Sequence, residues 1–311
     1  MGRRRKGDEV SGWLAIDKPS GLTSAAVVGR VRRQLNAAKV GHAGTLDPIA
    51  TGVLPIAFGE ATKTVPFAMD GAKRYRFTVR WGEGRDTDDC AGRVTATSPL
   101  RPSGAEIERA LAEFVGEIDQ VPPDYSAIKV AGQRAYDLAR AGDVFALEPR
   151  RIRIDGFRLV EERDADHAIF EVECGKGAYM RGLVRDIAAR LGTYGHIAEL
   201  RRLQVGRFRE ESAISLDKFE ALGHSPAAFE HLLPIETALA DIPALALTDT
   251  EAKLLQRGRP VQVLRTADKA LIDGMAEGDV VCAMAGGKPT ALTQVRREPI
   301  LQLHPVRVFN L

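Results

Sequence analysis

The sequence predicts an α+β fold, followed by a small, mostly β module at its C-terminal end. Helical and strand patterns are intermixed along the chain without the strict βαβ repetition of a doubly wound sheet. Beyond a break at about 235–247, where Pro234 and Pro243 flank small and polar residues, short apolar runs are separated by glycines. We therefore expect three parts, which are a basic disordered tail (1–10), a large domain (11–245) and a β module (246–311).

The first elements of the large domain follow from apolar runs and capping residues. A short strand is expected over 12–16, ending in the turn 18–21. Thr23 or Ser24 can cap the helix that follows. The apolar face of this helix is formed by Val27, Val28, Val31 and Leu35.

Later elements show two clear strand patterns, each connected to a helix. Residues 73–81 alternate between aromatic or aliphatic side chains and mostly basic ones, which predicts a half-buried strand. A capping box at 103–106 opens a helix with Ile107, Leu111, Phe114 and Val115 facing inward. A second alternating strand, 168–174, continues through glycines into a helix whose apolar face includes Leu183, Val184, Ile187, Ala188 and Leu191.

Composition excludes several classes of protein. The chain has 311 residues and 44% hydrophobic content, but it has no apolar run long enough for a membrane span. The charged N-terminus is not followed by an apolar segment, so we expect no secretory signal and a cytoplasmic location. Three distant cysteines and six histidines lack metal-binding spacing, so reduced thiols and no zinc site are expected.

Arginines are concentrated between 181 and 209, where seven of them stand against Asp186 and Glu199. Such clustering is typical of a surface that binds phosphates. A solvated helix face bearing salt bridges is the alternative, and this window alone does not decide between them. The net charge of the whole chain, +2, is too small to indicate a nucleic-acid partner.

The stretch 41–55 is the most informative part of the sequence. Three glycines and two prolines flank one carboxylate, Asp47, which predicts a tight and rigid loop. A carboxylate held on an ordered loop is placed for nucleophilic or acid–base chemistry. An aspartate before a proline is usually a turn residue, so a catalytic role for Asp47 depends on the motifs around it.

Seven motifs, in order along the chain, resemble those of the TruB family of pseudouridine synthases. The resemblance is strong over about 12–216 and fades beyond it. It implies a PUA-like C-terminal module and an RNA-gripping insertion over about 121–145. The motifs are 18–24 (KPSGLTS), 41–55 (GHAGTLDPIATGVLP), 59–63 (GEATK), 73–75 (KRY), 122–129 (PPDYSAIK), 176–181 (KGAYMR) and 196–203 (HIAELRRL).

The resemblance implies that uridine 55 in the T-loop of tRNA is isomerised to pseudouridine after the base is flipped out of its stack. Asp47 would be the catalytic nucleophile, acting either on C6 of the ring or on C1′ of the ribose. Arg181 would hold this carboxylate by a bidentate contact, since an ionised carboxylate in a dry pocket needs a cationic partner. Tyr75 would stack on the base or relay the C5 proton, with core packing as its alternative.

Four further residues are expected at the substrate by resemblance. Tyr179 and Leu200 would line the uracil pocket, His42 would lie against the flipped part of the T-loop, and Lys18 would add charge near the Asp47 loop. Leu200 could otherwise be a core residue and His42 a turn residue. The reaction needs no cofactor and no metal. We expect tRNA as the partner, no membrane, no guide RNA, and a monomer.

Other functions remain as alternatives at this stage. A tRNA-binding folding factor with weak or lost catalysis would use the same arginines, but pure binding needs no carboxylate such as Asp47. A guide-RNA-dependent synthase is disfavoured by the insertion at 121–145. The acidic run 86–89 lacks the spacing of a calcium loop and is expected to be a polar turn. The segment 59–63 lacks the order and length of a phosphate loop.

Overall fold

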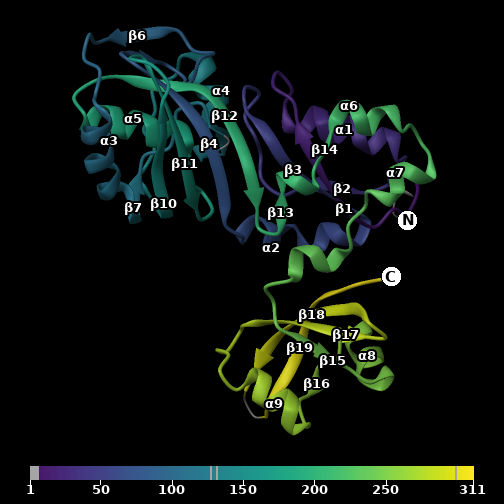
Figure 1. Ribbon diagram of the computed structural model, residues 1–311. Coiled ribbons are helices and arrows are strands. Elements are labelled where there is room, and N and C mark those ends of the chain that lie inside the picture. Colours follow the sequence, from purple (N-terminus) through teal and green to yellow (C-terminus); the bar gives the residue numbers. More distant parts are fainter. Residues whose placement is uncertain (1–6, 127, 131, 298–299) are drawn as a thin grey trace.

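The computed structural model describes residues 7–126, 128–130, 132–297 and 300–311. Its main feature is a 10-stranded mixed sheet in the order β14-β1-β3-β12-β4-β11-β10-β7 (Figure 1). The short strands β2 and β13 lie off this order and pair with β3 and β12, respectively. The predicted α+β class is confirmed. The strands are β1 (Gly12–Lys18), β2 (Val40–His42), β3 (Thr51–Phe58), β4 (Lys73–Trp81), β7 (Gly116–Gln120), β10 (Arg150–Glu162), β11 (His167–Cys174), β12 (Gly195–Val205), β13 (Phe208–Arg209) and β14 (Ile214–Ser215).

The N-terminal part folds largely as its sequence pattern predicts. Thr23 caps α1 (Ser24–Gln34), because its hydroxyl accepts a hydrogen bond from Ala26 N. The expected disorder over 1–10, however, does not hold for its last residues. Asp8 N donates to Asn36 O, and Val10 is buried, so the expectation of disorder is wrong for this part of it. Residues 1–6 lie outside the described part of the chain.

One face of the sheet carries the main core. Phe77 of β4 stacks on Phe170 of β11, with ring centroids 5.7 Å apart. The helices α3 (Gly104–Leu111) and α5 (Met180–Arg190) pack on this face, and α1 and α6 (Leu216–Ala221) cover its other half. The predicted capping box of α3 is confirmed. Val115 was expected to face inward but is 46% exposed, because the chain leaves α3 through η2 (Ala112–Phe114) and is extended at Val115.

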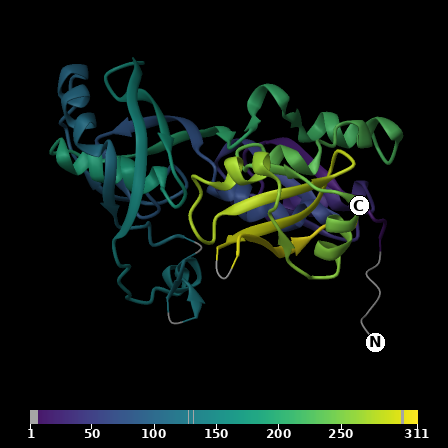
Figure 2. The same ribbon diagram turned by 90° about the horizontal axis from the view of Figure 1, so that it is seen from below.

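The opposite face, beneath β1 and β3, is covered by η1 (Gly59–Thr64), α2 (Val65–Asp70), η4 (Ile235–Leu239) and a second, 5-stranded sheet. Phe309 of this C-terminal module shares an apolar cluster with Trp13 and Phe208 of the large sheet. Seen from below, the module lies in front of the N-terminal segments of the large domain (Figure 2). The two sheets are thus separate, but they bury a common core. The module consists of β15 (Ala244–Ala246), α8 (Asp249–Gln256), β16 (Val261–Gln262), α9 (Thr266–Ile272), β17 (Val280–Ala285), β18 (Lys288–Arg296) and β19 (Gln302–Val308).

Two excursions leave the large sheet on the side of the main core. The hairpin β5 (Glu83–Arg85) and β6 (Val94–Thr97) follows β4, and the segment between β7 and β10 carries β8 (Lys129–Val130), β9 (Gln133–Arg134) and α4 (Ala135–Ala141). Short elements complete the fold, namely η3 (Glu210–Ser212) and α7 (Pro226–Glu230). None of the helices in the described ranges is long and apolar enough to cross a membrane.

Candidate active site

Asp47 lies on a loop between β2 and β3. The predicted loop over 41–55 is shorter in the structure, because both of its ends belong to these two strands. The loop is internally hydrogen-bonded, with Ala50 N donating to Asp47 O at 3.1 Å. Ser24, at the start of α1, holds the neighbouring Leu46 through both its backbone N–H and its carbonyl. The loop is therefore ordered, as expected for a positioned carboxylate.

Two buried cations hold this loop from below. The fully buried Lys18 donates to the carbonyls of Leu22 at 2.7 Å, Pro19 at 2.9 Å and Pro48 at 3.3 Å. Burial lowers the pKa of Lys18 to about 8, against the opposing effect of the Asp47 charge. Since its ammonium points to carbonyls inside the protein, the geometry supports a positioning role for Lys18 rather than contact with substrate.

Arg202 of β12 is the second of these cations. Its buried guanidinium donates to the carbonyls of Val53 at 2.8 Å, Gly44 at 3.0 Å and Thr45 at 3.4 Å. Gly52 lets β12 approach this closely, because a Cβ at that position would lie 2.2 Å from Arg202 O. The motif 196–203 contains Arg202 but does not indicate this role, since only the pairing of β12 with β3 brings Arg202 next to the loop.

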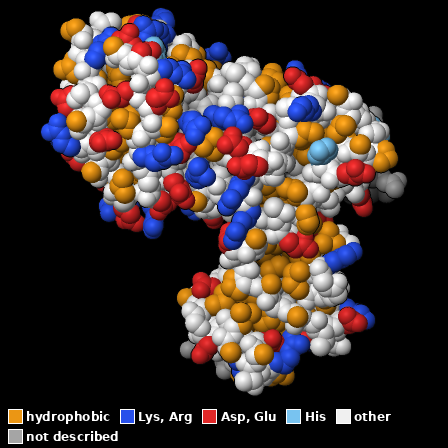
Figure 3. All heavy atoms as spheres, viewed as in Figure 1, with side chains coloured by type: hydrophobic (Ala, Val, Ile, Leu, Met, Phe, Trp, Pro, Cys, Tyr) orange, Lys and Arg blue, Asp and Glu red, His pale blue; other side chains and the backbone are white. Residues whose placement is uncertain are grey.

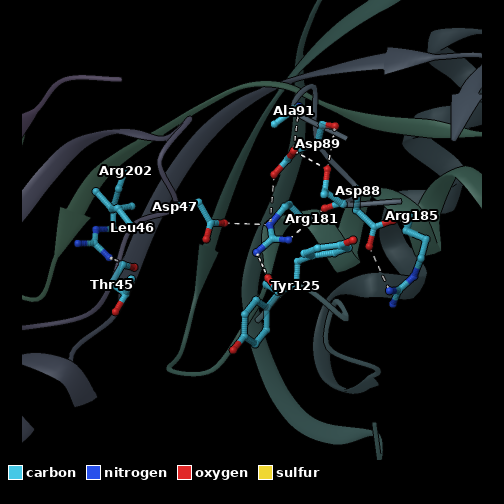
Figure 4. Close-up of polar contacts among 12 residues, drawn as sticks. Thr45, Leu46, Asp47, Asp88, Asp89, Ala91, Tyr125, Arg181, Arg185 and Arg202 are labelled. Atoms are coloured by element: carbon cyan, nitrogen blue, oxygen red, sulfur yellow. Dashed lines mark hydrogen bonds and ion pairs between the residues drawn. The ribbon is translucent and has the colours of Figure 1, made fainter. Parts of the chain in front are cut away.

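Arg181 contacts Asp47 as predicted, but through a single nitrogen (Figure 4). Its Nε donates to Asp47 Oδ2 at 2.9 Å, whereas Nη1 donates to Thr87 O at 3.0 Å and Nη2 to Tyr125 O at 2.8 Å. The predicted bidentate contact is therefore wrong. The Arg181 side chain is 4% exposed and that of Asp47 is 34% exposed, so the carboxylate is held on one side and open on the other.

The acidic run 86–89 forms a turn between β5 and β6, as expected, but this turn reaches the site. The buried Asp89 lies 3.8 Å from Arg181 Nε and accepts hydrogen bonds from Thr87 Oγ1 and Ala91 N. Arg181 is thus placed between two carboxylates, Asp47 and Asp89. No group of metal-ligating residues occurs in the described part of the chain. No local signal in the sequence identifies Asp89, because its turn has the pattern of a polar surface turn.

The other predicted site residues lie around this pair. Tyr75, on the same face of β4 as Phe77, is directly opposite Arg202. Burial raises the pKa of the Tyr75 phenol, against the opposing effect of the Arg202 charge. Tyr179 stands at the N-cap of α5, where its backbone N–H and carbonyl both bond to the side-chain amide of Gln120. Burial likewise raises the pKa of the Tyr179 phenol.

Leu200 and His42 complete the set. Leu200 lies on β12 opposite Phe77 and packs in the main core. This placement supports the alternative that Leu200 is a core residue. The His42 Nδ1 atom is buried and has no hydrogen-bond partner among the described residues. Burial lowers the pKa of His42, and the Arg202 charge lowers it further, so the ring is kept neutral.

The arginine cluster between 181 and 209 is mostly engaged within the protein. Arg201 pairs with Asp17 and Glu210, Arg190 pairs with Glu113, and Arg207 pairs with Asp241. Space-filling atoms show basic and acidic side chains mixed across the middle of one face (Figure 3). For these residues the salt-bridge alternative is correct, and the interpretation as a phosphate-binding surface is not supported.

Two solved structures have a similar fold. The chain matches the crystal structure of a Cbf5-Nop10-Gar1 complex with a TM-score of 0.72 and 24% identity over 96% of this chain and 84% of that one. It matches the archaeal box H/ACA sRNP Nop10-Cbf5 complex with a TM-score of 0.71 and 22% identity over 100% and 93%. These two matches show that the chain shares its fold with the Cbf5 proteins.

Sequence comparisons define both the class of protein and its family. The model of the TruB family pseudouridylate synthase N-terminal domain matches residues 32–180, and that of the tRNA pseudouridylate synthase B C-terminal domain matches 181–240. Proteins named tRNA pseudouridine synthase B are 54% identical over the full length of both chains in Rhodospirillum rubrum, and 60% identical over 84% of this chain and 86% of the relative in Gluconacetobacter diazotrophicus. The chain belongs to the TruB family.

Proposed function

We propose that this protein isomerises uridine 55 in the T-loop of tRNA to pseudouridine, with Asp47 as the nucleophile. One observation carries the proposal. Asp47 is held through Oδ2 by the buried Arg181, yet its side chain remains 34% exposed on an ordered loop. A carboxylate fixed on one side and open on the other is suited to attack a bound nucleoside. Membership of the TruB family supports this reaction, and the names of its relatives support tRNA as substrate.

The reaction breaks the C1′–N1 bond of the uridine and forms a C1′–C5 bond. Asp47 would either add to C6 of the ring or take up C1′ as the base is released, and it leaves again when the new bond has formed. The C5 proton is then lost and N1 gains a proton, so the atoms balance without an oxidant or a second substrate. Arg181 stabilises the carboxylate at the start and end of the cycle. The phenol of Tyr75 supplies a stacking surface and a route for the proton.

The remaining residues position the loop and receive the base. Lys18 and Arg202 hold the Asp47 loop from below, and neither needs to touch the RNA in this proposal. Tyr179 and Leu200 flank the site, and the neutral His42 supplies a hydrogen-bonding ring at its edge. In this proposal no cofactor, metal or guide RNA takes part.

The rest of the chain provides contacts to the RNA. In this proposal 11–245 is the catalytic domain, its excursion over about 121–145 grips the T-stem-loop, and 246–311 is a PUA-like module that contacts the tRNA elsewhere. The protein would act as a monomer in the cytoplasm, where tRNA is found. Charge contacts to phosphates would supply much of the affinity.

The direct test is to incubate the purified protein with an unmodified tRNA transcript and to map pseudouridine by carbodiimide-dependent primer extension. We expect one stop, at position 55, that is absent with Asp47→Asn and with a transcript carrying cytidine at that position. Tight binding without any modification would instead favour a tRNA-folding factor. A stop at another uridine would retain the enzyme but reject the assigned position.

A further inference from the structure

The N-terminal half of α5 is tied to the start of the 121–145 excursion at three places. Gln120 exchanges two hydrogen bonds with the backbone of Tyr179. Arg181 Nη2 donates to Tyr125 O at 2.8 Å, and one turn further along, Arg185 Nη2 donates to Val121 O at 2.7 Å. We call residues 120–125 the root of the excursion. The same helix therefore positions both the catalytic Arg181 and this root.

The contact at Arg185 has a partner on the acidic turn after β5. Arg185 Nη1 lies 3.3 Å from Asp88 Oδ2 (Figure 4). Its Nε lies 3.0 Å from Oδ1 of the adjacent Asp186. Gly182 allows the root to lie this close to the helix, since a Cβ there would come within 3.3 Å of the Gln120 amide. Arg185 thus bridges the acidic turn and the root, as Arg181 does one turn earlier.

Asp88 is an unfavourable residue for stability alone. Its φ is 58°, a left-handed conformation that is uncommon outside glycine, although Asp and Asn adopt it more often than other residues. Burial raises the pKa of the Asp88 carboxylate from 3.8 to about 6, against the opposing charges of Arg185 and Arg181 of α5, and the charges of Asp186 of α5 and Asp124 of the root raise it further. A raised pKa means that the folded state binds the proton more readily than the unfolded state. The ionised form therefore lowers stability at neutral pH.

We propose that Asp88 and Arg185 are positioning residues, which hold the root of the 121–145 excursion in a fixed position relative to the catalytic Arg181. The role deepens the proposed function, because it rests on the excursion contacting the RNA. Without the Asp88–Arg185 pair, the root keeps its hydrogen bonds to Tyr179 and Arg181 but loses the hydrogen bond from Arg185 to Val121 O. The excursion then samples more positions, and RNA capture weakens while the chemistry at Asp47 persists.

The first test needs no RNA and so stands apart from the proposed function. Hydrogen exchange of the full chain is compared for wild type, Arg185→Met and Arg190→Met, where Arg190 lies on α5 but pairs with the exposed Glu113. We expect faster exchange in peptides covering the root and α4 for Arg185→Met only. Equal exchange in wild type and Arg185→Met would overturn the proposal, even if the protein modifies tRNA as expected.

The second test uses Asp88→Asn, which keeps the shape and suits a left-handed conformation. Its KM for tRNA should rise about fivefold at pH 7.5, as expected for loss of one partly exposed ion pair, with kcat within twofold of wild type. In wild type KM should rise as pH falls through about 6, where Asp88 becomes protonated, and this rise should be absent from the variant. The variant's Tm at pH 7.5 should not fall. A lower Tm with wild-type KM would show a merely structural ion pair and refute the inference.

Discussion

Replacing Arg181 by lysine should lower kcat strongly although the positive charge is kept. The guanidinium makes three hydrogen bonds, to Asp47, Thr87 and Tyr125, and an ammonium on a shorter stem cannot reach all three in one position. Loss of a preorganised donor at a developing charge costs about 2–4 kcal/mol, which is roughly 30- to 1000-fold in kcat. Single-turnover kinetics on an unmodified tRNA transcript at saturating enzyme measures this fall directly.

The matched control is Arg190→Lys, on the same helix. Arg190 pairs with Glu113 where both side chains are about half exposed, so we expect no measurable change in turnover. Circular dichroism of each variant at the assay temperature separates lost chemistry from lost folding. Near-normal turnover in Arg181→Lys would refute this prediction. It would mean that one hydrogen bond to Asp47 suffices and that those to Thr87 and Tyr125 are not needed to place the cation.

Three further predictions concern the carboxylate, the stacking residue and the C-terminal module. Asp47→Asn should abolish turnover and leave tRNA affinity within a few-fold, as checked by filter binding; residual turnover would remove Asp47 from the nucleophile role. Tyr75→Phe should bind normally but turn over slowly, whereas Tyr75→Leu should also lose about 1–3 kcal/mol of stacking in binding assays; equal, wild-type rates in both would indicate core packing. Truncation after Pro243 should give an aggregating or less stable protein, because it uncovers the cluster shared by Trp13 and Phe309; an unchanged Tm would show that the two sheets fold independently.

Elements with a strong local pattern were predictable. The alternation over 73–81 predicted β4 with the bounds the structure has, because a strand with one buried face must repeat every two residues. The Asp47–Arg181 contact was also expected, although the two residues are 134 positions apart. That expectation came from resemblance between motifs. No local pattern around either residue predicts this contact.

The site contacts that the sequence did not predict depend on the register between distant strands and on the path of a turn. Arg202 looks like any member of an arginine-rich window, and only its place on β12 puts it beneath the Asp47 loop. Asp89 belongs to a turn that every local rule assigns to the surface, yet the β5–β6 hairpin directs it at Arg181. The single-nitrogen contact of Arg181 has the same origin, since the carbonyls that occupy its other nitrogens lie on two unrelated segments.

The anchoring of the Asp47 loop by Arg202 has a consequence for how the protein is made. Gly44, whose carbonyl receives that guanidinium, precedes Arg202 by 158 positions. At a synthesis rate of about 5–20 residues per second, the loop leaves the ribosome roughly 8–30 s before its support. Lys18 can hold Pro48 early, but the carbonyls of Gly44 and Thr45 meet the Arg202 guanidinium only when β12 inserts between β3 and β4. A nascent chain that is stopped before β12 should therefore carry Asp47 on a loop that is not yet anchored for catalysis.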